Sequence, residues 1–341
     1  MIFAALFLCA LPTSAAAVTG TSAQAVVAAP VAVGEPQIEW KAPDLYIAGL
    51  PYEVSVSVTA PQDGAPVAGW MLTASAFTVN GKPLAERKGT DIMQIAGGAH
   101  LELSFDLAPA IVSSGLVEGE GFELAYAKEN IESPAVAVEV LPPAPTDLDF
   151  MEMPLEQLDD YWVVMDTTQG VMVAEMWPDV APKHSRNFLD LAYTKFYDGL
   201  TFHRVMRGFM IQGGDPDGTG AGSGPRHIKA EFSQKRHVRG VLSAARLGHD
   251  IDSATSQFFV MHATNPGLDG KYSAFGKLVK GDDTLERIAT TRVKRNQSGD
   301  LSMPVETQFT KRMVVVMAPA KDTEKADDKP ADSGTNLKKK Q

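Results

Sequence analysis

The residues between 202 and 225, FHRVMRGFMIQGGDPDGTGAGSGP, combine side-chain types that could carry chemistry. Two arginines stand in an apolar run, Gln212 follows them, and a glycine-rich coil with Asp215 and Asp217 comes next. Three kinds of site use such residues: a loop that holds phosphate through backbone N–H groups, a carboxylate loop that binds a metal ion, and a pocket that binds an uncharged group. The spacing of the residues distinguishes the three.

The spacing does not fit the first two kinds of site. A phosphate loop ends in Gly-Lys-Ser or Gly-Lys-Thr, or has glycines in the order GxGxxG, whereas these glycines alternate at 218, 220, 222 and 224. A calcium loop that begins at Asp215 needs a bidentate glutamate at its twelfth position, which is Arg226. The sequence also lacks HExxH and GxSxG motifs. It therefore predicts a site without metal or cofactor.

The element that carries the apolar run must position its polar residues. As a strand, the run would place Arg204, Met210 and Gln212 on one face, because successive side chains of a strand point to opposite faces. A bend at Gly208 would bring Phe209 to the same place. The result is a fixed cation beside an apolar surface and an amide. An ordinary strand with a surface arginine fits these residues as well, and the segment alone leaves both interpretations open.

The rest of the chain favours the first interpretation through a resemblance. FHRVMRGFMIQGGDP is followed by AEF at 230–232, RGVLSAAR at 239–246, SQFFV at 256–260 and LDGKYSAFGKLVKG at 268–281. In this order, and nearly at this spacing, the segments resemble the signature segments of cyclophilins, which are peptidyl-prolyl cis-trans isomerases. The resemblance covers about residues 159–318 and does not extend to the N-terminal part or the C-terminal tail.

The resemblance implies a mainly β protein. The expected fold is a closed eight-stranded antiparallel barrel capped by two helices, with an active groove across its outer face. Arg204 matches the catalytic arginine, and Gln212 matches the glutamine that orients it. The resemblance assigns substrate binding to residues that receive the proline ring or line the groove: His203, Phe209, Met210, Ala245, Arg246, Gln257, Phe259, Leu268 and Tyr272. Phe202 and Phe275 are expected in the core instead.

Two of these positions depart from the family pattern. Tyr272 stands where many relatives have histidine, and Arg246 replaces a common asparagine whose family contact is made largely by the backbone. The segment from 247 to 255, LGHDIDSAT, is also longer than in short relatives by about one to two residues. We expect activity to be retained and substrate choice to change at this segment.

The assigned residues suit the rotation of an Xaa-Pro bond. Rotation about a peptide bond has a barrier of roughly 18–20 kcal/mol, because resonance is lost in the twisted state. A catalyst therefore needs only to favour that state, without a nucleophile, metal or acid–base pair. Arg204 would donate a hydrogen bond to the prolyl nitrogen, whose lone pair is exposed only on twisting, while an apolar pocket holds the ring.

The remainder of the chain predicts export and a second domain. An apolar run at 2–11 and the small residues that follow predict a signal peptide over 1–17, although the usual positive start is absent, since the first lysine is Lys41. The single cysteine, Cys9, lies inside this leader, so the mature chain would have no thiol chemistry. We expect an exported protein of the periplasm or cell envelope.

The remaining boundaries follow from composition and periodicity. A linker over 18–36 leads to period-two strands between 37 and 142, which predict an immunoglobulin-like β-sandwich, and Asn80-Gly81 gives a hairpin signal. Prolines at 141–147 predict a second linker over 143–158 before the isomerase domain at 159–318. The charged residues of 319–341 predict a disordered tail.

Charge and composition bound the partners. The net charge of -11 disfavours nucleic acid, and the leader run is too short for a membrane span. We expect a monomer that acts on proline-containing polypeptides and a sandwich that serves as spacer or docks an envelope partner. Two alternatives stay open: a non-catalytic module that holds proline-containing segments, and a protein whose main role is attachment through the sandwich.

Overall fold

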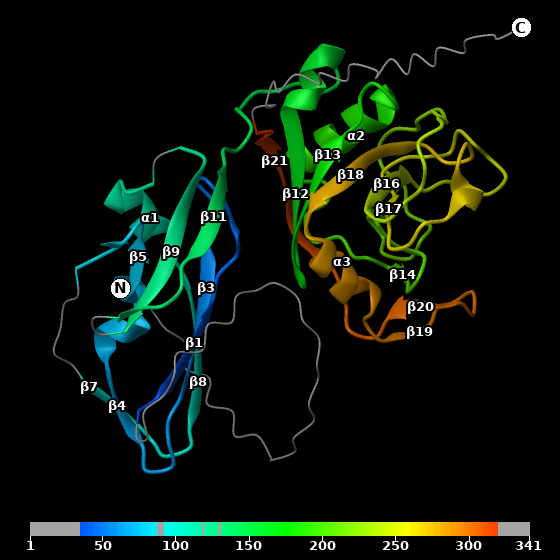
Figure 1. The fold of residues 1–341 in the computed structure, drawn as a ribbon. Coiled ribbons are helices and arrows are strands. Elements are labelled where there is room, and N and C mark those ends of the chain that lie inside the picture. The colour runs from blue at the N-terminus through cyan, green and yellow to red at the C-terminus, as the bar shows by residue number, and fades with distance from the viewer. Residues whose placement is uncertain (1–34, 87–91, 118, 129–130, 320–341) are drawn as a thin grey trace, which may run out of the picture. The chain divides into compact units, whose positions relative to one another are not determined.

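The structure is a computed structural model that describes residues 35–86, 92–117, 119–128 and 131–319 (Figure 1). The described chain forms two compact units that part between Val140 and Leu141, with residues 281–290 grouped with the first unit. The predicted signal peptide with Cys9, most of the first linker and nearly all of the predicted tail lie outside the described residues. No helix among the described residues is long and apolar enough to cross a membrane.

The first unit consists mainly of short strands, as the alternating valines predict. Val54, Val56 and Val58 of β3 are buried while the residues between them are half-buried, so one face of this strand forms core. Its strands are β1 (Gln37–Lys41), β2 (Leu45–Ile47), β3 (Glu53–Thr59), β4 (Ala65–Ala68), β5 (Phe77–Val79), β6 (Lys82–Pro83), β7 (Ile92–Ile95), β8 (His100–Asp106), β9 (Gly121–Lys128), β10 (Ile131–Glu132) and β11 (Val136–Leu141). The helical segments before residue 141 are η1 (Gly69–Leu72), η2 (Ala74–Ala76) and α1 (Ala108–Ser114).

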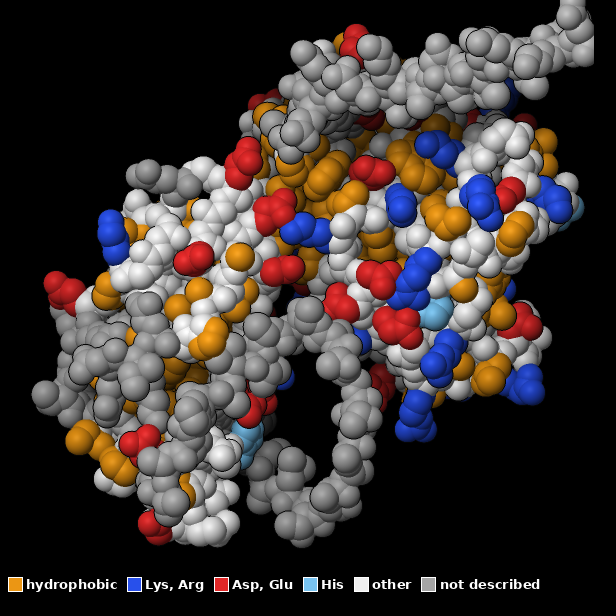
Figure 2. Space-filling view, viewed as in Figure 1, with side chains coloured by type: hydrophobic (Ala, Val, Ile, Leu, Met, Phe, Trp, Pro, Cys, Tyr) orange, Lys and Arg blue, Asp and Glu red, His pale blue; other side chains and the backbone are white. Residues whose placement is uncertain are grey.

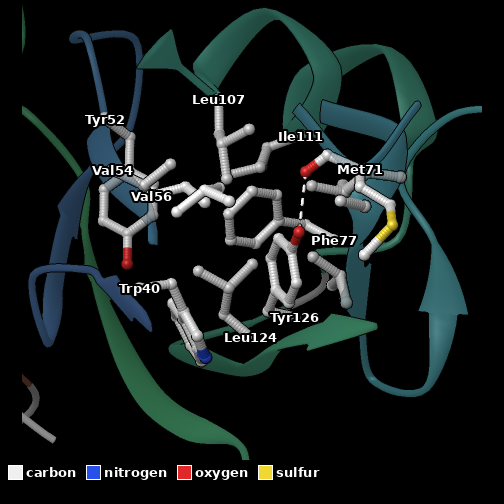
Figure 3. Close-up of a cluster of buried hydrophobic side chains, with 14 of the residues drawn as sticks. Trp40, Tyr52, Val54, Val56, Met71, Phe77, Leu107, Ile111, Leu124 and Tyr126 are labelled. Carbon is white, nitrogen blue, oxygen red and sulfur yellow. Dashed lines mark hydrogen bonds between the residues drawn. The ribbon is translucent and has the colours of Figure 1, made fainter. Parts of the chain in front are cut away.

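These strands form antiparallel sheets around one apolar core. One sheet has the order β1-β3-β8, a second has the order β2-β11-β9-β5-β6, and β4 pairs with β7. Figure 3 shows side chains from both larger sheets packed together, with the Phe77 ring edge-on to Trp40 and to Tyr126. The Tyr126 hydroxyl donates to the Met71 carbonyl at 2.7 Å, which satisfies its polar end inside the core. Asn80, at positive φ, makes the predicted hairpin turn between β5 and β6.

The second unit is a curled eight-stranded antiparallel half-barrel. Its strand order is β14-β15-β17-β16-β18-β13-β12-β21, and the single bridge between Thr201 and Phe309 links the residues just before its two edge strands. The strands are β12 (Tyr161–Thr167), β13 (Gly170–Met176), β14 (Arg204–Met206), β15 (Met210–Gly213), β16 (Val241–Ala244), β17 (Phe258–Met261), β18 (Ala274–Lys280) and β21 (Thr310–Met317). A separate hairpin joins β19 (Val293–Arg295) to β20 (Leu301–Pro304).

Two longer helices accompany these strands. The first, α2 (Pro182–Tyr193), begins with proline at its first turn and contacts β12, β18 and β21, where Phe188, Leu189 and Leu191 are buried. The second, α3 (Asp282–Ala289), follows β18 and has acidic residues in its first turn. Shorter helical turns are η3 (Leu155–Asp160) and η4 (Pro266–Leu268).

The segment predicted as the second linker, 143–158, packs closely on the second unit. Phe150 is fully buried and meets the rings of Tyr161 and Tyr193 edge-on, with centroids 5.1 and 5.4 Å apart. Arg186 donates to the Phe150 carbonyl at 2.8 Å. The prolines predict a spacer, and the apolar residues that follow them supply core.

Candidate active site

The hairpin of β14 and β15 positions Arg204 and Gln212. The two residues are cross-strand partners, so both side chains leave the same face of the sheet. Gly208 turns the chain at a φ of 77°, and Phe209 N–H donates to the Met206 carbonyl at 2.9 Å. The predicted bend is therefore a complete turn, and the single strand expected from the sequence is two short strands. The shared face of Arg204, Met210 and Gln212 is retained.

A chain of hydrogen bonds fixes the guanidinium. Arg204 Nη1 donates to Gln212 Oε1 at 3.3 Å, and Gln212 Nε2 donates to Gln257 Oε1 at 3.0 Å. Gln257 Nε2 in turn donates to the carbonyls of Gly220 and Gly222 at 3.1 and 2.8 Å. Each amide therefore has its orientation set by the next partner, and the last partners are backbone carbonyls that cannot rotate away.

An apolar cluster lies beside this chain of hydrogen bonds. Gln212 is the cross-strand partner of Phe259, which is buried in the cluster. The buried members are Met210, Val241, Phe259, Met261 and Ala274, and the partly buried members are Trp177, Met206, Phe209, Val238, Ala245, Leu268 and Tyr272. The structure therefore brings together every apolar residue that the sequence assigned to the proline pocket. Phe202 and Phe275 are buried elsewhere in the core, as predicted.

An aromatic residue, Tyr272, and a cationic one, Arg246, lie on one side of the cluster. The Tyr272 ring meets the Phe259 ring edge-on with centroids 5.7 Å apart, and the Arg246 guanidinium carbon lies 4.6 Å from the Tyr272 centroid. Ala245, which precedes Arg246, belongs to the same cluster. Both departures from the family pattern thus stand next to each other at the site.

His203 lies at the other end of the site, next to Arg204 in the chain. A Cβ on Gly220 would lie 3.7 Å from the His203 ring. Burial lowers the pKa of His203, and the positive charge of Arg204 lowers it further, while the carboxylate of Asp215 acts in the opposite direction. We therefore expect a neutral imidazole at neutral pH, which leaves Arg204 as the cation at this end of the site.

The glycine-rich coil is organised by Asp215, a residue that the sequence did not single out for this role. Its carboxylate is fully buried and accepts hydrogen bonds from the backbone N–H groups of Asp217 and Gly220. Burial raises the pKa of Asp215, but these N–H groups outweigh that effect and bring the pKa below its ordinary value. A Cβ on Gly222 would lie 1.9 Å from Asp215 Oδ1, so only glycine fits there.

A second group that the sequence did not reveal supports Phe259 from below. The His237 ring stacks near the Phe259 ring at a centroid distance of 6.3 Å. Its Nδ1 lies 3.0 Å from Asp269 Oδ1, and its Nε2 lies 3.1 Å from Ser243 Oγ. Ser243 is fully buried, so this serine, histidine and aspartate hold the floor of the cluster and do not form a hydrolytic site. Their spacing in the sequence matches no motif that would have identified them.

Comparisons with known proteins show which family this chain resembles. A family model described as "Cyclophilin type peptidyl-prolyl cis-trans isomerase/CLD" matches residues 162–313. A peptidyl-prolyl cis-trans isomerase of Synechococcus elongatus is 38% identical over 42% of this chain and 95% of its own. Peptidyl-prolyl cis-trans isomerase 10 of Caenorhabditis elegans is 41% identical over 38% of this chain and 83% of its own.

A solved structure is similar as well. It is a cyclophilin type peptidyl-prolyl cis-trans isomerase of Cryptosporidium parvum, determined in the presence of the dipeptide Ala-Pro. The two sequences are 31% identical, the match covers 46% of this chain and 99% of the solved chain, and the TM-score is 0.42.

Proposed function

The chain belongs to the cyclophilin family of peptidyl-prolyl cis-trans isomerases, and from that premise we propose that Arg204 accelerates Xaa-Pro rotation by stabilising the twisted amide. The observation that carries the proposal is the Arg204 guanidinium, held by Gln212 beside the apolar cluster around Phe259. The cluster would take the proline ring, which has no charge and no N–H donor. The guanidinium would then lie where the prolyl nitrogen becomes an acceptor.

The chemistry of arginine supports this role. The guanidinium keeps its charge at any physiological pH and presents its donors in a rigid plane. One donor is engaged by Gln212, which leaves others for a substrate. A hydrogen bond that forms only on twisting stabilises the transition state without tightening the ground state, so it raises kcat.

The test replaces Arg204 and measures catalysed exchange. We expect Arg204→Ala to lower kcat on an Xaa-Pro peptide by about 10²-fold, since removal of one transition-state donor commonly costs 10²–10³. Exchange NMR measures the rate, and circular dichroism checks that the fold is intact. Arg207→Ala is the matched control, because this exposed arginine lies in the turn of the same hairpin. Unchanged catalysis in Arg204→Ala would exclude the proposed role.

The same variant separates catalysis from simple binding. If the site only holds proline-containing segments, wild-type protein binds the peptide and leaves its exchange rate unchanged. If it is an isomerase, Arg204→Ala still binds the peptide through the apolar cluster but no longer accelerates exchange. Titration of the peptide, followed by NMR shifts, measures binding in both proteins.

We further propose that the protein is exported and acts on envelope or secreted clients, with the first unit as spacer or docking module. The support is the apolar run at 2–11 followed by small residues. Expression of the full chain in a bacterium, fractionation, and mass spectrometry of the mature N-terminus test this. A cytoplasmic protein that still begins at Met1 would contradict it.

We also propose that the first unit is an immunoglobulin-like sandwich. In the second unit, we propose that the half-barrel closes between the segments that precede β14 and β21. The bridge of Thr201 and Phe309 supports the closure. Slow hydrogen exchange at Phe202 N–H, which donates to the Gln308 carbonyl at 2.8 Å, is expected if the closure is stable.

A further inference from the structure

The resemblance assigns Arg246 to the substrate groove largely through its backbone, and the guanidinium of this residue is engaged with the protein itself. Nη1 donates to the carbonyls of Leu247 and Gly248 at 2.8 and 3.3 Å, and Nη2 donates to the Lys271 carbonyl at 3.2 Å. Its Nε is buried. The donors therefore point to two backbone segments, 247–248 and 271, that are separated by more than twenty residues in the chain.

The flat face of the same guanidinium covers Tyr272. Its central carbon lies 4.6 Å from the ring centroid, within the range of a cation–π contact. A planar guanidinium can stack on a ring while it donates hydrogen bonds within its own plane, whereas an ammonium cannot do both. Arg246 is thus the shared partner of the Tyr272 ring and of the loop that begins at Leu247.

This loop is held mainly by local contacts, and one distant hydrogen bond runs from Ala230 N–H to Asp252 Oδ1 at 2.8 Å. Leu247 N–H donates to Ser253 Oγ at 2.8 Å, and Ser253 Oγ donates to the Asp250 carbonyl at 2.7 Å. Leu247 and Ile251 are 56% and 52% exposed, so they contribute little burial that could hold the loop in place. The hydrogen bonds from Arg246 connect the start of the loop to Lys271, next to Tyr272 of the site.

Tyr272 also contacts residues of the proposed proline pocket. Tyr272 meets Phe259 edge-on, and Tyr272 N–H donates to the Leu268 carbonyl at 3.2 Å. Phe259 and Leu268 are both members of the apolar cluster. The position of the Tyr272 ring therefore decides the shape of one side of the pocket.

We infer that Arg246 is a positioning residue, which fixes the Tyr272 ring and the loop of residues 247–253 as one rigid wall of the substrate groove. The inference rests on the proposed isomerase function. A wall holds the planar and the twisted peptide alike, so its loss weakens binding in both states and raises KM with little change in kcat. This pattern is the opposite of that expected for Arg204.

The test compares four variants in exchange NMR with an Xaa-Pro peptide. Arg246→Ala is expected to raise KM about ten-fold and to change kcat less than two-fold, the size of the KM effect following from the loss of hydrogen bonds made by a charged group. Arg246→Lys should restore less than half of this loss, because an ammonium cannot keep the stack and the carbonyls together. Tyr272→Leu should reproduce the KM of Arg246→Ala, whereas Tyr272→Phe, which keeps the ring, should raise KM less than Tyr272→Leu does.

A double variant tests whether the two residues act as one unit. Arg246→Ala combined with Tyr272→Leu should raise KM no further than either change alone, since neither partner has a function without the other. Additive effects would overturn the inference, and so would a folded Arg246→Ala variant with unchanged KM. If Arg246→Ala does not fold, the cycle is made with Arg246→Lys, and an unchanged KM there overturns it equally.

Two controls distinguish a specific role of Arg246 from a general effect of losing an arginine and from failure of the proposed function. Arg295→Ala removes an arginine that also donates to a backbone carbonyl, that of Gly299, but that belongs to the β19–β20 hairpin, and its KM should stay unchanged. A wild-type protein that does not accelerate exchange would refute the proposed function. In that case the peptide dissociation constant is measured in place of KM. If this constant is the same in wild type and Arg246→Ala, Arg246 does not position the groove, and the inference is wrong.

Discussion

Arg204 and Gln212 owe their geometry to direct cross-strand pairing. Opposite partners in an antiparallel hairpin share one face, so the amide reaches the guanidinium without any contribution from a loop. Gln257, the residue just before β17, then fixes the amide of Gln212. Catalysis by a charged donor depends on such prior orientation, because a mobile arginine would lose part of its interaction energy in becoming ordered.

We predict that Gln212→Leu lowers kcat/KM less than Arg204→Ala does. The change leaves Arg204 Nη1 and Gln257 Oε1 without the partner that each has now, while the charge of Arg204 remains. We expect kcat/KM to fall about ten-fold, the equivalent of one hydrogen bond of about 1.4 kcal/mol. Exchange NMR measures this. Gln212→Glu is the comparison, since it keeps an acceptor for Arg204, and a smaller loss there than in Gln212→Leu is required.

The N-terminus of α2 shows how an element is anchored by a residue far away in the chain. The helix begins after Ala181, which offers no side-chain cap. Glu231 supplies one instead: its carboxylate accepts from the backbone N–H groups of Lys183 and His184, and it lies 2.7 Å from His184 Nδ1. A carboxylate at this place also favours the helix dipole.

The protonation of Glu231 gives a pH prediction. Burial raises the pKa of Glu231, but the hydrogen bonds from His184 and Lys183 outweigh it, so the folded pKa lies below the unfolded one. The unfolded state then binds more protons, and the stabilisation by Glu231 is present above the unfolded pKa and lost as pH falls through the folded pKa.

We therefore expect Glu231→Gln to lower the free energy of unfolding by about 1–2 kcal/mol at pH 7, as for loss of a helix cap. The difference should shrink as pH falls below about 4.3, the ordinary pKa of glutamate. Urea unfolding at several pH values measures this. Lys183→Ala, which keeps the backbone N–H that Glu231 accepts from, is the control and should show no such pH trend. A constant difference between wild type and Glu231→Gln at all pH values would contradict the assignment.

The whole molecule divides its charge unevenly between its parts. Residues 35–140 contain fifteen acidic and five basic residues, whereas 141–318 contain twenty-two and twenty. Figure 2 shows Lys and Arg side chains gathered around the β19–β20 hairpin, where Lys294 and Arg295 are exposed. The low pI of 5.1 therefore describes mainly the first unit, and the isomerase unit is almost neutral.

The N-terminal boundary of the isomerase unit lies before residue 142, because the segment that follows packs on this unit. Pro142 and Ala144 hydrogen-bond to β21, and Phe150 and Leu158 are fully buried. We expect a fragment of residues 141–318 to fold and to keep wild-type activity on short peptides. A fragment of residues 161–318 should melt roughly 10 °C or more lower, because loss of Phe150 alone is worth about 3–5 kcal/mol.

Thermal unfolding of the two fragments measures this difference. Phe150→Ala in the longer fragment is the control, and it should account for much of the loss. Equal melting temperatures for the two fragments would show that residues 141–160 are a linker after all.

The sequence alone assigned the candidate residues of the site, because strand alternation and the order of the cyclophilin segments are local properties of the chain. Arg204, Met210 and Gln212 share a face for that reason, and the valines of β3 predicted a half-buried strand. The sequence could not determine contacts between segments far apart in the chain, since these depend on strand register and on the closing of loops.

Only the tertiary structure decided the use of the remaining residues. It ends the hydrogen bonds of Gln257 on Gly220 and Gly222, caps α2 with Glu231 and buries Phe150 of the predicted linker. It also places the Arg246 guanidinium over the Tyr272 ring. The physical reason is the same in each case: residue type limits what a side chain can bind, and the folded chain decides which of those partners lies within reach.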